Sequence, residues 1–139
     1  MADYTQLNLK DDVENVAERF GLAPDMETRY GRKPLAIEGG GFSYQKLAGN
    51  YRPTTAHRQR TQEEVYIAIA GSGRVKIGHE IRDVRQWDAI RVAPGVARGF
   101  EAGPDGLELL AVGFGDAGDV EMLEEFWPPS TERAPEQED

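Results

Sequence analysis

The stretch from His57 to Phe100 decides the fold of this chain. It consists of short apolar blocks divided by glycine and proline, and in order these are His57-Arg58-Gln59, Glu63-Glu64-Val65-Tyr66-Ile67-Ala68-Ile69-Ala70, Gly71-Ser72-Gly73, Arg74-Val75-Lys76-Ile77, Gln86-Trp87-Asp88-Ala89-Ile90-Arg91-Val92-Ala93-Pro94-Gly95 and Arg98-Gly99-Phe100. Runs of β-branched and aromatic residues bounded in this way indicate strands. The stretch therefore predicts an all-β sandwich or barrel, and it holds nearly every residue that could take part in chemistry.

The beginning of this stretch resembles the first half of the cupin signature, which reads H-x-H, three or four residues, E, six residues, G. The corresponding positions here are His57, Gln59, four residues, Glu64, six residues and Gly71. The spacing is reproduced, and Gln59 stands in place of the second histidine. Spacing of this kind is fairly specific for a fold.

The second half of the signature is matched at Pro94-Gly95, and Arg98 stands where the family has a histidine. The resemblance covers roughly residues 42–112. It implies a cupin-type double-stranded β-helix, which is a jelly-roll barrel, in a small single-domain protein whose metal-ligand positions are altered.

Length and charge set the organisation of the chain. Its 139 residues suffice for one domain, which we predict over residues 1–128 with a barrel core at about 26–114. Net charge is −9, and residues 116–139 carry nine of the acidic groups against the single Arg133. We therefore expect the end of the chain, residues 129–139, to be an acidic, disordered tail.

Several classes of partner and location are disfavoured by composition. Residues 1–115 are nearly neutral and carry no basic stripe, which disfavours nucleic-acid binding. No run of apolar residues approaches the length of a membrane span and no basic leader precedes one. No cysteine is present, which fits a reducing compartment. We expect a cytoplasmic protein without a membrane partner.

Local patterns place the remaining elements. Asp11 and Asp12 are N-cap candidates for one short amphipathic helix that ends at Gly21, and a second short helix is expected from Asp119 to Pro128. Short strands are expected at 26–30, 35–38, 42–47 and 107–114, and tight turns at 39–41, 71–73, 78–79 and 103–106.

The strand at residues 64–70 is apolar on both faces. With a period of two, Glu64 and Tyr66 share one face, and Val65, Ile67 and Ile69 share the other. If Glu64 points into the barrel, the opposite face needs a covering layer, either the N-terminal segment or a second subunit. We expect a homodimer that covers it.

The candidate site admits a metal and a metal-free interpretation. In the first, the ligands are His57, Gln59 and Glu64, although Gln59 offers only a neutral carbonyl oxygen and the guanidinium of Arg98 repels a cation. In the second, which we favour, Arg98 takes over the charge of the metal by a charge-assisted hydrogen bond to Glu64. No cofactor is then needed, and the alternative is a weakly held divalent transition metal.

Two classes of function follow from these interpretations. The metal-free cluster could bind a polar or anionic small molecule between the apolar walls of Tyr66 and Phe100, or its groups could merely satisfy one another in a vestigial barrel. The alternative is an enzyme, either a metal-dependent cupin of the dioxygenase type or a metal-free sugar isomerase or epimerase. In the enzyme, His57 oriented by Glu64 would act as general base.

Overall fold

The computed structural model describes residues 3–53, 55–115, 120–124 and 126–127 of the chain. It is mainly β, as the sequence predicts. The strands are β1 (Met26–Tyr30), β2 (Gly40–Leu47), β3 (Thr55–Gln59), β4 (Glu63–Ile77), β5 (Glu80–Arg85), β6 (Ala89–Val92), β7 (Arg98–Phe114) and β8 (Val120–Glu124). The helices are short: α1 (Leu9–Asp12), the 3-10 helix η1 (Val16–Phe20) and α2 (Arg32–Leu35). The expected tail at 129–139 lies outside the described residues.

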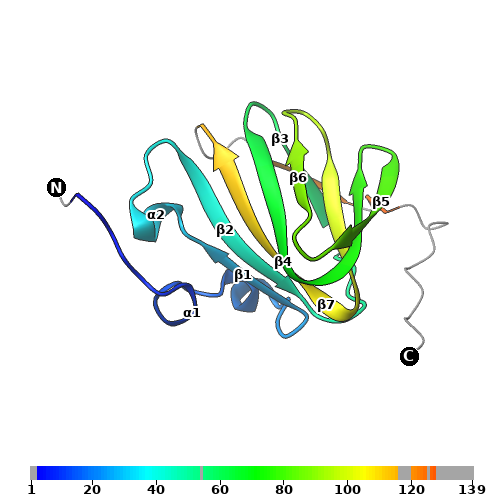
Figure 1. Ribbon diagram of the computed structural model, residues 1–139, viewed down its shortest axis with the longest axis horizontal. Coiled ribbons are helices and arrows are strands. Elements are labelled where there is room, and N and C mark those ends of the chain that lie inside the picture. Colours follow the sequence, from blue (N-terminus) through cyan, green and yellow to red (C-terminus); the bar gives the residue numbers. More distant parts are fainter. Residues whose placement is uncertain (1–2, 54, 116–119, 125, 128–139) are drawn as a thin grey trace.

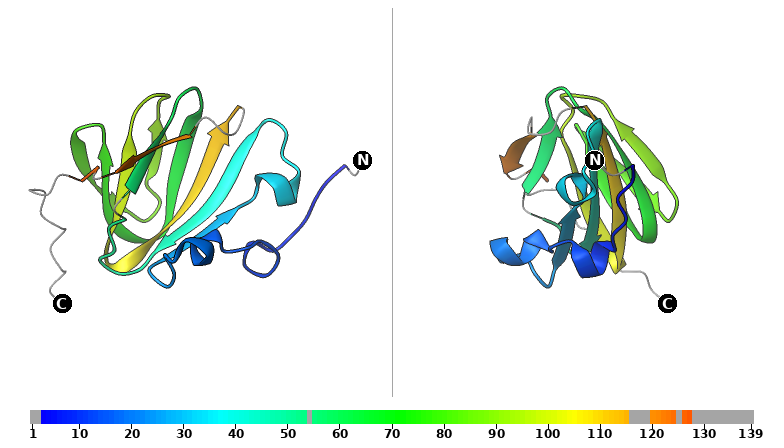
Figure 2. Two further views of the ribbon diagram at one scale, coloured as in Figure 1. Left: turned by 180° about the vertical axis from the view of Figure 1, so that it is seen from behind. Right: turned by 90° about the vertical axis from the view of Figure 1, so that its left-hand side faces the viewer.

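Two long strands, β4 and β7, form the spine of the sheet. They pair antiparallel from Glu63 opposite Phe114 to Ile77 opposite Arg98. The first half of β4 also pairs with β6, and the second half of β7 with β2, which in turn pairs with β1. The second half of β4 pairs with β5, and the start of β7 pairs with β3. Strand β8 pairs with the other edge of β3. The sheet thus curls into two layers around one interior (Figures 1 and 2).

The interior between the two layers holds a compact apolar core. Its buried side chains come mainly from the inward face of β4 and β7, together with single residues of the neighbouring strands, and they are Leu47, Tyr66, Ala68, Val75, Val84, Val92, Phe100, Ala102, Leu107, Leu109 and Ala111. The predicted alternation in β4 is confirmed, since Tyr66 and Ala68 are buried while Val65 and Ile67 face outward. The alternation of side chains along the strand therefore determines which face of the sheet is buried in the interior.

Glycines let β4 and β7 bend from one layer into the other. A Cβ atom on Gly73 would lie 2.0 Å from the carbonyl oxygen of Glu101, and one on Gly71 would lie 2.0 Å from that of Gly106. The register of the pair shifts at the same place, between Ala68 and Gly73. Such bulges increase the local bend of a strand pair. The tight turns expected at 71–73 and 103–106 are therefore wrong: both glycine clusters lie inside long strands, at the corner of the barrel.

The N-terminal helix is interrupted, contrary to the single helix expected from Asp11 and Asp12. Asn8 caps α1 by accepting from the backbone N–H groups of Lys10 and Asp11, at 2.9 and 3.1 Å. Asn15 then caps η1 and also accepts from the backbone N–H of Thr28 in β1, at 2.9 Å. Asn15 ties the chain to the sheet and stops it from continuing as one helix.

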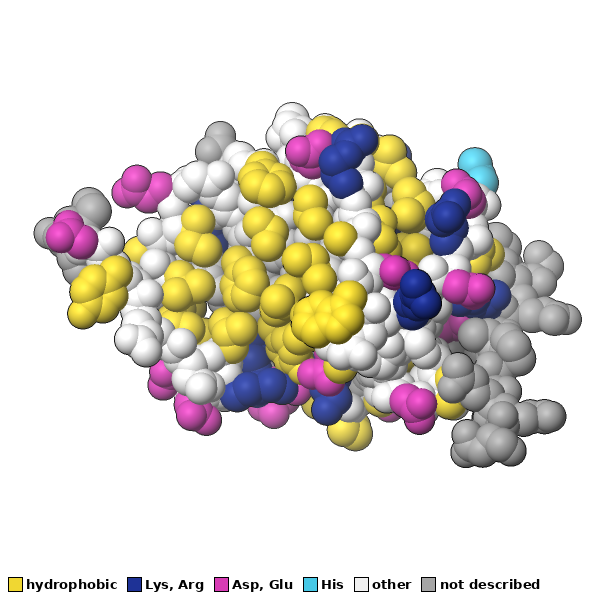
Figure 3. All heavy atoms as spheres, viewed as in Figure 1, with side chains coloured by type: hydrophobic (Ala, Val, Ile, Leu, Met, Phe, Trp, Pro, Cys, Tyr) yellow, Lys and Arg dark blue, Asp and Glu magenta, His cyan; other side chains and the backbone are white. Residues whose placement is uncertain are grey.

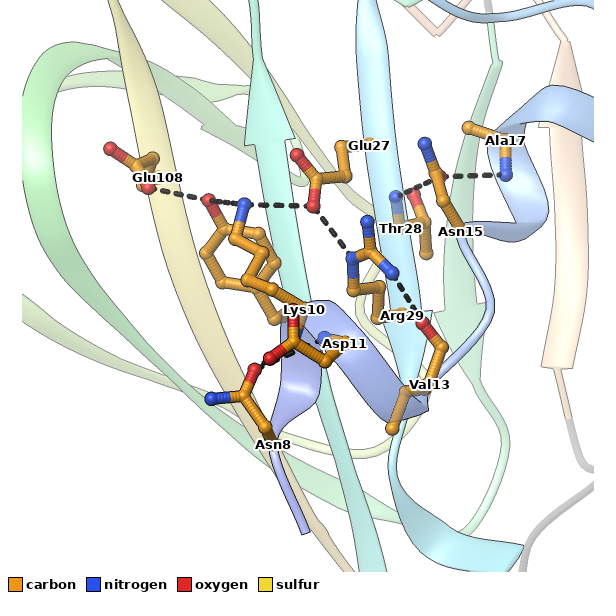
Figure 4. A network of polar contacts seen from close by, with 11 residues as sticks. Asn8, Lys10, Asp11, Val13, Asn15, Ala17, Glu27, Thr28, Arg29 and Glu108 are labelled. Atoms are coloured by element: carbon orange, nitrogen blue, oxygen red, sulfur yellow. Dashed lines mark hydrogen bonds and ion pairs between the residues drawn. The ribbon is translucent and has the colours of Figure 1, made fainter. Parts of the chain in front are cut away.

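Polar contacts hold this N-terminal segment against the outer surface of β1 and β2 (Figure 4). Lys10 Nζ donates to Glu27 at 2.8 Å, and Arg29 donates to Glu27 at 2.6 Å and also to the carbonyl of Val13. Tyr44, beneath Lys10, donates its hydroxyl hydrogen to Glu108. Burial and the Glu108 carboxylate raise the pKa of Tyr44. The segment thus covers one end of the outer face of the sheet.

Two further expectations for local structure are wrong. Residues 35–38, expected as a strand, form the end of α2 and the segment after it, and the backbone N–H of Leu35 bonds to the carbonyl of Gly31 at 2.9 Å. The helix expected from Asp119 is replaced by β8, which pairs with the free edge of β3. Arg58 of β3 donates to both carboxylate oxygens of Glu121, at 3.0 and 2.9 Å. An available strand edge outweighs the weak helical pattern of a five-residue segment.

A band of hydrophobic side chains lies on the outer face of β2, β4 and β7 (Figure 3). Cross-strand register places Phe42, Val112 and Val65 in one row, and Leu110 and Ile67 in the next. All five are half-buried, and Trp87 nearby is 69% exposed. Patches of this kind on soluble proteins mark interaction surfaces. The expected homodimer stays a prediction, and this face is the surface through which we expect it to form.

No helix among the described residues is long and apolar enough to cross a membrane.

Replacing Gly73 with alanine should destabilise the protein by at least about 1–3 kcal/mol, because the new methyl group meets a backbone carbonyl that cannot move away. Gly39→Ala is the matched control, since a Cβ atom there meets nothing within 4 Å. Urea unfolding of the two variants measures the difference. Equal stability of both variants would show that the corner has room for a side chain.

Light scattering at micromolar concentration tests the dimer. We expect twice the mass of the chain for the natural protein. For Ile67→Glu we expect the mass of one chain, because a buried carboxylate at an interface lacks a partner. Ile81→Glu, the same change in the exposed strand β5, should leave the dimer intact. A monomeric mass for the natural protein would contradict the expectation.

Candidate functional site

A cavity of about 520 Å³ opens into the barrel, and the six residues selected from the sequence all line it: His57, Gln59, Glu64, Tyr66, Arg98 and Phe100. They come from β3, β4 and β7, two from each strand. The two members of each pair are separated by one residue, so that both side chains point to the same face. The strand period therefore explains why the spacing of the sequence brings these groups together.

Cross-strand pairing places the groups of different strands side by side. His57 of β3 lies opposite Arg98 of β7, the single pair that links these two strands. Glu64 and Tyr66 lie in the half of β4 that bends away toward the other layer. Phe100 packs on Tyr66 with ring centroids 4.9 Å apart and an angle of 56° between the ring planes. The polar groups thus sit at the inner end of the cavity against an aromatic wall.

Glu64, Tyr66 and His57 form a network that is centred on one oxygen of Glu64. Tyr66 donates its hydroxyl hydrogen to Glu64 Oε1 at 2.6 Å, and His57 Nε2 lies 3.3 Å from the same oxygen. Nε2 of His57 also lies 3.1 Å from the hydroxyl oxygen of Tyr66. The orientation of His57 by Glu64 that the sequence suggested is present, and Tyr66, expected as an apolar wall, also supplies a hydrogen-bond donor.

The network sets the charge of its members. Burial alone would raise the pKa of the Glu64 carboxyl, but the hydrogen bonds from His57 and Tyr66 and the positive charge of Arg98 hold that pKa below its usual value. Burial, followed by the negative charge of Glu64, raises the pKa of Tyr66 well above its usual value. At neutral pH the site therefore contains an ionised Glu64 and a neutral Tyr66.

Arg98 does not form the hydrogen bond to Glu64 that the sequence predicts. The two groups make only a long ion pair, with Nη2 of Arg98 3.9 Å from Oε1 of Glu64. Arg98 is 0% exposed, and its Nε, Nη1 and Nη2 atoms find no hydrogen-bond acceptor in the part of the chain that the structure describes. Glu64 Oε1 turns instead to Tyr66 and His57, which lie closer. The expected charge-assisted hydrogen bond is thus absent, whereas the expected pairing of Arg98 with Glu64 is present as this long ion pair.

Gln59 has a similar unsatisfied group. Its side chain is buried, and within the described ranges its Oε1 atom has no hydrogen-bond donor. An unpaired buried acceptor and an unpaired buried guanidinium are costly, so most proteins satisfy such groups with a partner or a ligand. The inner end of the cavity therefore contains both unpaired hydrogen-bond donors and an unpaired acceptor.

The donor set fits a divalent metal poorly. No group of three or more histidine, cysteine, aspartate or glutamate side chains that could hold an ion occurs among the described residues. His57 and Glu64 are the two strong ligand types at the site, and the Arg98 guanidinium lies beside Glu64. A cation coordinated by Glu64 would meet this positive charge at close range. The residues present thus do not form the closed or open ligand sets known for transition metals.

Several lining residues were not selected from the sequence as part of a site. They are large apolar side chains contributed by η1, the segment after it, β1 and β8: Phe20, Leu22, Met26, Tyr30, Val120 and Met122. The helical pattern of residues 13–20 indicated packing on the sheet, and β8 was expected to be a helix. No local signal shows that these segments surround the opening of a cavity, because their position depends on which strand edge each one meets.

Tyr66→Phe should raise the pKa of Glu64, because it removes the shortest hydrogen bond to the carboxylate. At neutral pH the loss should cost about 1.5–3 kcal/mol of stability, the usual range for a hydrogen bond to a charged group. Because the folded pKa of Glu64 is lowered, its contribution is full above the unfolded value of 4.5 and disappears as the pH falls through the folded value. The cost of Tyr66→Phe should therefore shrink in acid.

The measurement combines NMR titration of the Glu64 side chain with urea unfolding at several pH values. Tyr51→Phe is the control, since it removes a hydroxyl from the lining of the same cavity, and the charge that raises the pKa of Tyr51 besides burial is Asp25 and not Glu64. An unchanged Glu64 pKa in Tyr66→Phe would contradict the network.

No family model matches the chain, and no curated protein sequence matches it. Solved structures do match. A cupin protein from Bacteroides fragilis has a TM-score of 0.67 at 23% identity, with 87% of this chain and 91% of that chain covered. A protein with a double-stranded β-helix domain from Klebsiella pneumoniae has a TM-score of 0.66 at 14% identity, with 86% and 96% covered.

Larger enzymes contain the same unit. Oxalate decarboxylase from Bacillus subtilis matches with a TM-score of 0.71 at 21% identity; 88% of this chain is covered, and 33% of the decarboxylase chain. At such identities the likeness concerns the fold alone. Strand pairing and these matches together confirm the resemblance seen in the sequence: this protein has the cupin fold, a double-stranded β-helix with short helices at its N-terminal side.

Proposed function

We propose that the protein binds a polar or anionic small molecule inside the barrel, without a tightly held metal. The observation that carries the proposal is Arg98, a fully buried guanidinium in the cavity wall whose three nitrogens lack acceptors among the described residues. Guanidinium groups favour planar oxygen acceptors such as carboxylates, which they bind with two parallel hydrogen bonds. A ligand of that kind would satisfy the group.

The shape and composition of the cavity support this proposal. Its volume of about 520 Å³ falls within the roughly 300–1,000 Å³ of small-molecule pockets. Such pockets combine mostly apolar walls with a few convergent polar groups. Here the walls include Phe100 and Leu47, and the polar groups are His57, Glu64 and Arg98. Mutual satisfaction in a vestigial barrel accounts for the first two polar groups but not for Arg98.

An enzyme that moves a proton without metal is the second candidate, and the Tyr66, His57 and Glu64 network favours it. His57 Nε2 lies within 3.3 Å of two oxygen atoms that differ strongly in acidity. A substrate proton taken up by His57 would find a carboxylate close by to stabilise the imidazolium. A sugar isomerase or epimerase would have to hold several substrate hydroxyl groups, for which the lining also offers Thr28, Ser43 and Gln45. A dioxygenase of the metal-dependent type would need a third strong ligand.

The proposal predicts how the melting temperature of the protein responds to added small molecules. In a panel of carboxylates, polyols and neutral amides, at least one anion should raise Tm as its concentration rises, since a ligand that binds only the folded state stabilises it. Zinc and nickel should give no such rise. If no member of the panel raises Tm, small-molecule binding is wrong.

Arg98→His makes the metal part of the proposal testable in the same assay. It would create a ligand set of two histidines and Glu64, so zinc or nickel should now raise Tm. Arg91→His, at an exposed position of β6, is the matched control and should not respond. Stoichiometric, tight zinc binding by the natural protein would contradict the metal-free proposal.

A further inference from the structure

The cavity differs chemically between its buried and its exposed lining. The buried lining holds the polar cluster described above. The exposed lining is formed by large apolar side chains that are 38–72% exposed: Phe20, Leu22, Tyr30, Val120 and Met122. Two of them, Val120 and Met122, lie on β8 directly across from Gln59 and His57. We call these five residues the apolar rim. Large apolar side chains gathered around an opening mark a place where a ligand buries apolar surface.

The polar end is dominated by one cation that has no strong partner. Tyr66 and His57 hold Glu64 Oε1, which leaves it 3.9 Å from Nη2 of Arg98 and outside hydrogen-bond range. The donors of Arg98 therefore have no acceptor among the described residues, and an oxygen atom that reached them would satisfy them. A carboxylate matches the planar fork of donors with its two oxygens.

We infer that the cavity takes an amphipathic monocarboxylate, with the carboxylate at Arg98 and an alkyl or aromatic body against the apolar rim. The inference rests on the proposed function, because it names the chemical class of the small molecule. A polyol or sugar acid leaves the apolar rim without an apolar partner, and a neutral amphipathic molecule leaves Arg98 without a counter-charge.

Glu64 limits the charge that this ligand can carry. The nitrogens of Arg98 are shielded by neighbouring side chains, so an incoming carboxylate must shift part of the cavity wall. Glu64 is the nearest wall group of like charge, and it repels the carboxylate while competing with it for Arg98. One guanidinium beside one carboxylate favours a single negative charge on the ligand and disfavours a dianion.

Isothermal titration calorimetry with four probes tests the ligand class. Octanoate has the carboxylate and the apolar body, octanamide has the same body with a neutral head, acetate has the head alone, and gluconate carries a carboxylate on a polar body. We expect octanoate to bind roughly tenfold or more tightly than each of the others, which is the scale of one charge-assisted hydrogen bond or one buried apolar group.

Three variants and one control variant locate the two halves of the site. Arg98→Met keeps an unbranched side chain without donors and should abolish the preference for octanoate over octanamide, because only the like charge of Glu64 then faces the carboxylate. Glu64→Gln should tighten octanoate binding and leave octanamide unchanged, because it removes the repelling charge. Met122→Asp, at an exposed position of the apolar rim, should weaken octanoate roughly tenfold or more, whereas Met122→Leu should bind as the natural protein does. Met122→Asp tests the inference even if Arg98→Met fails to fold.

Different outcomes separate the inference from the proposed function. Octanamide or gluconate binding as tightly as octanoate overturns the monocarboxylate, while small-molecule binding stands. Weaker octanoate binding in Glu64→Gln overturns the placement of the carboxylate at Arg98. If none of the four probes binds at millimolar concentration, the ligand class is wrong, and the wider panel of the thermal measurement then decides whether the proposed function is wrong as well.

Discussion

The pairing of β4 with β7 positions all the remaining strands of the barrel. These two strands run antiparallel along their whole length, and each carries neighbours of one layer on its first half and of the other layer on its second. The bend between the halves requires backbones to approach more closely than a side chain allows, which is why Gly71 and Gly73 face carbonyl groups at the corner. The bend in turn brings Glu64, in one half of β4, to the same cavity as Arg98 at the start of β7.

Strand β7 also carries a second buried charge, and its surroundings differ from those of Arg98. Glu101 points to the opposite face and is 1% exposed, yet it accepts hydrogen bonds from Arg52 at 2.6 Å and Arg74 at 3.0 Å. The Arg52 guanidinium also lies 4.5 Å from the ring centroid of Trp127. The buried charge of Glu101, on the outward face of β7, is thus paired with arginine side chains of the protein itself. Against that background, the unpaired donors of Arg98 differ from the other buried charge of the strand, and they are the observation on which the proposed ligand binding rests.

The sequence predicted the fold and the six cavity residues because both depend on spacing. Alternation with a period of two placed Tyr66 inside and Val65 outside, and the cupin-like spacing placed His57, Glu64 and Arg98 on facing strands. Hydrogen-bond partners were predicted less well. Arg98 was paired with Glu64 because opposite charges attract, but Tyr66 and His57 compete for the same carboxylate oxygen at shorter range. Such competition depends on small differences in distance, here 2.6 and 3.3 Å against 3.9 Å, which no pattern of residue types encodes.

What the sequence determined by itself is local: strand periodicity, the αL cap at Gly21, the turn at Gly78 and the chemical types available to the site. Only the tertiary structure decided that the glycines at 71–73 bend a continuous strand and that residues 120–124 complete a sheet edge. It also decided that Phe20 and Met122 meet at the opening of one cavity. The physical reason is that glycine permits a turn and a bulge equally well, and that a short segment adopts whichever structure the neighbouring edge can hydrogen-bond.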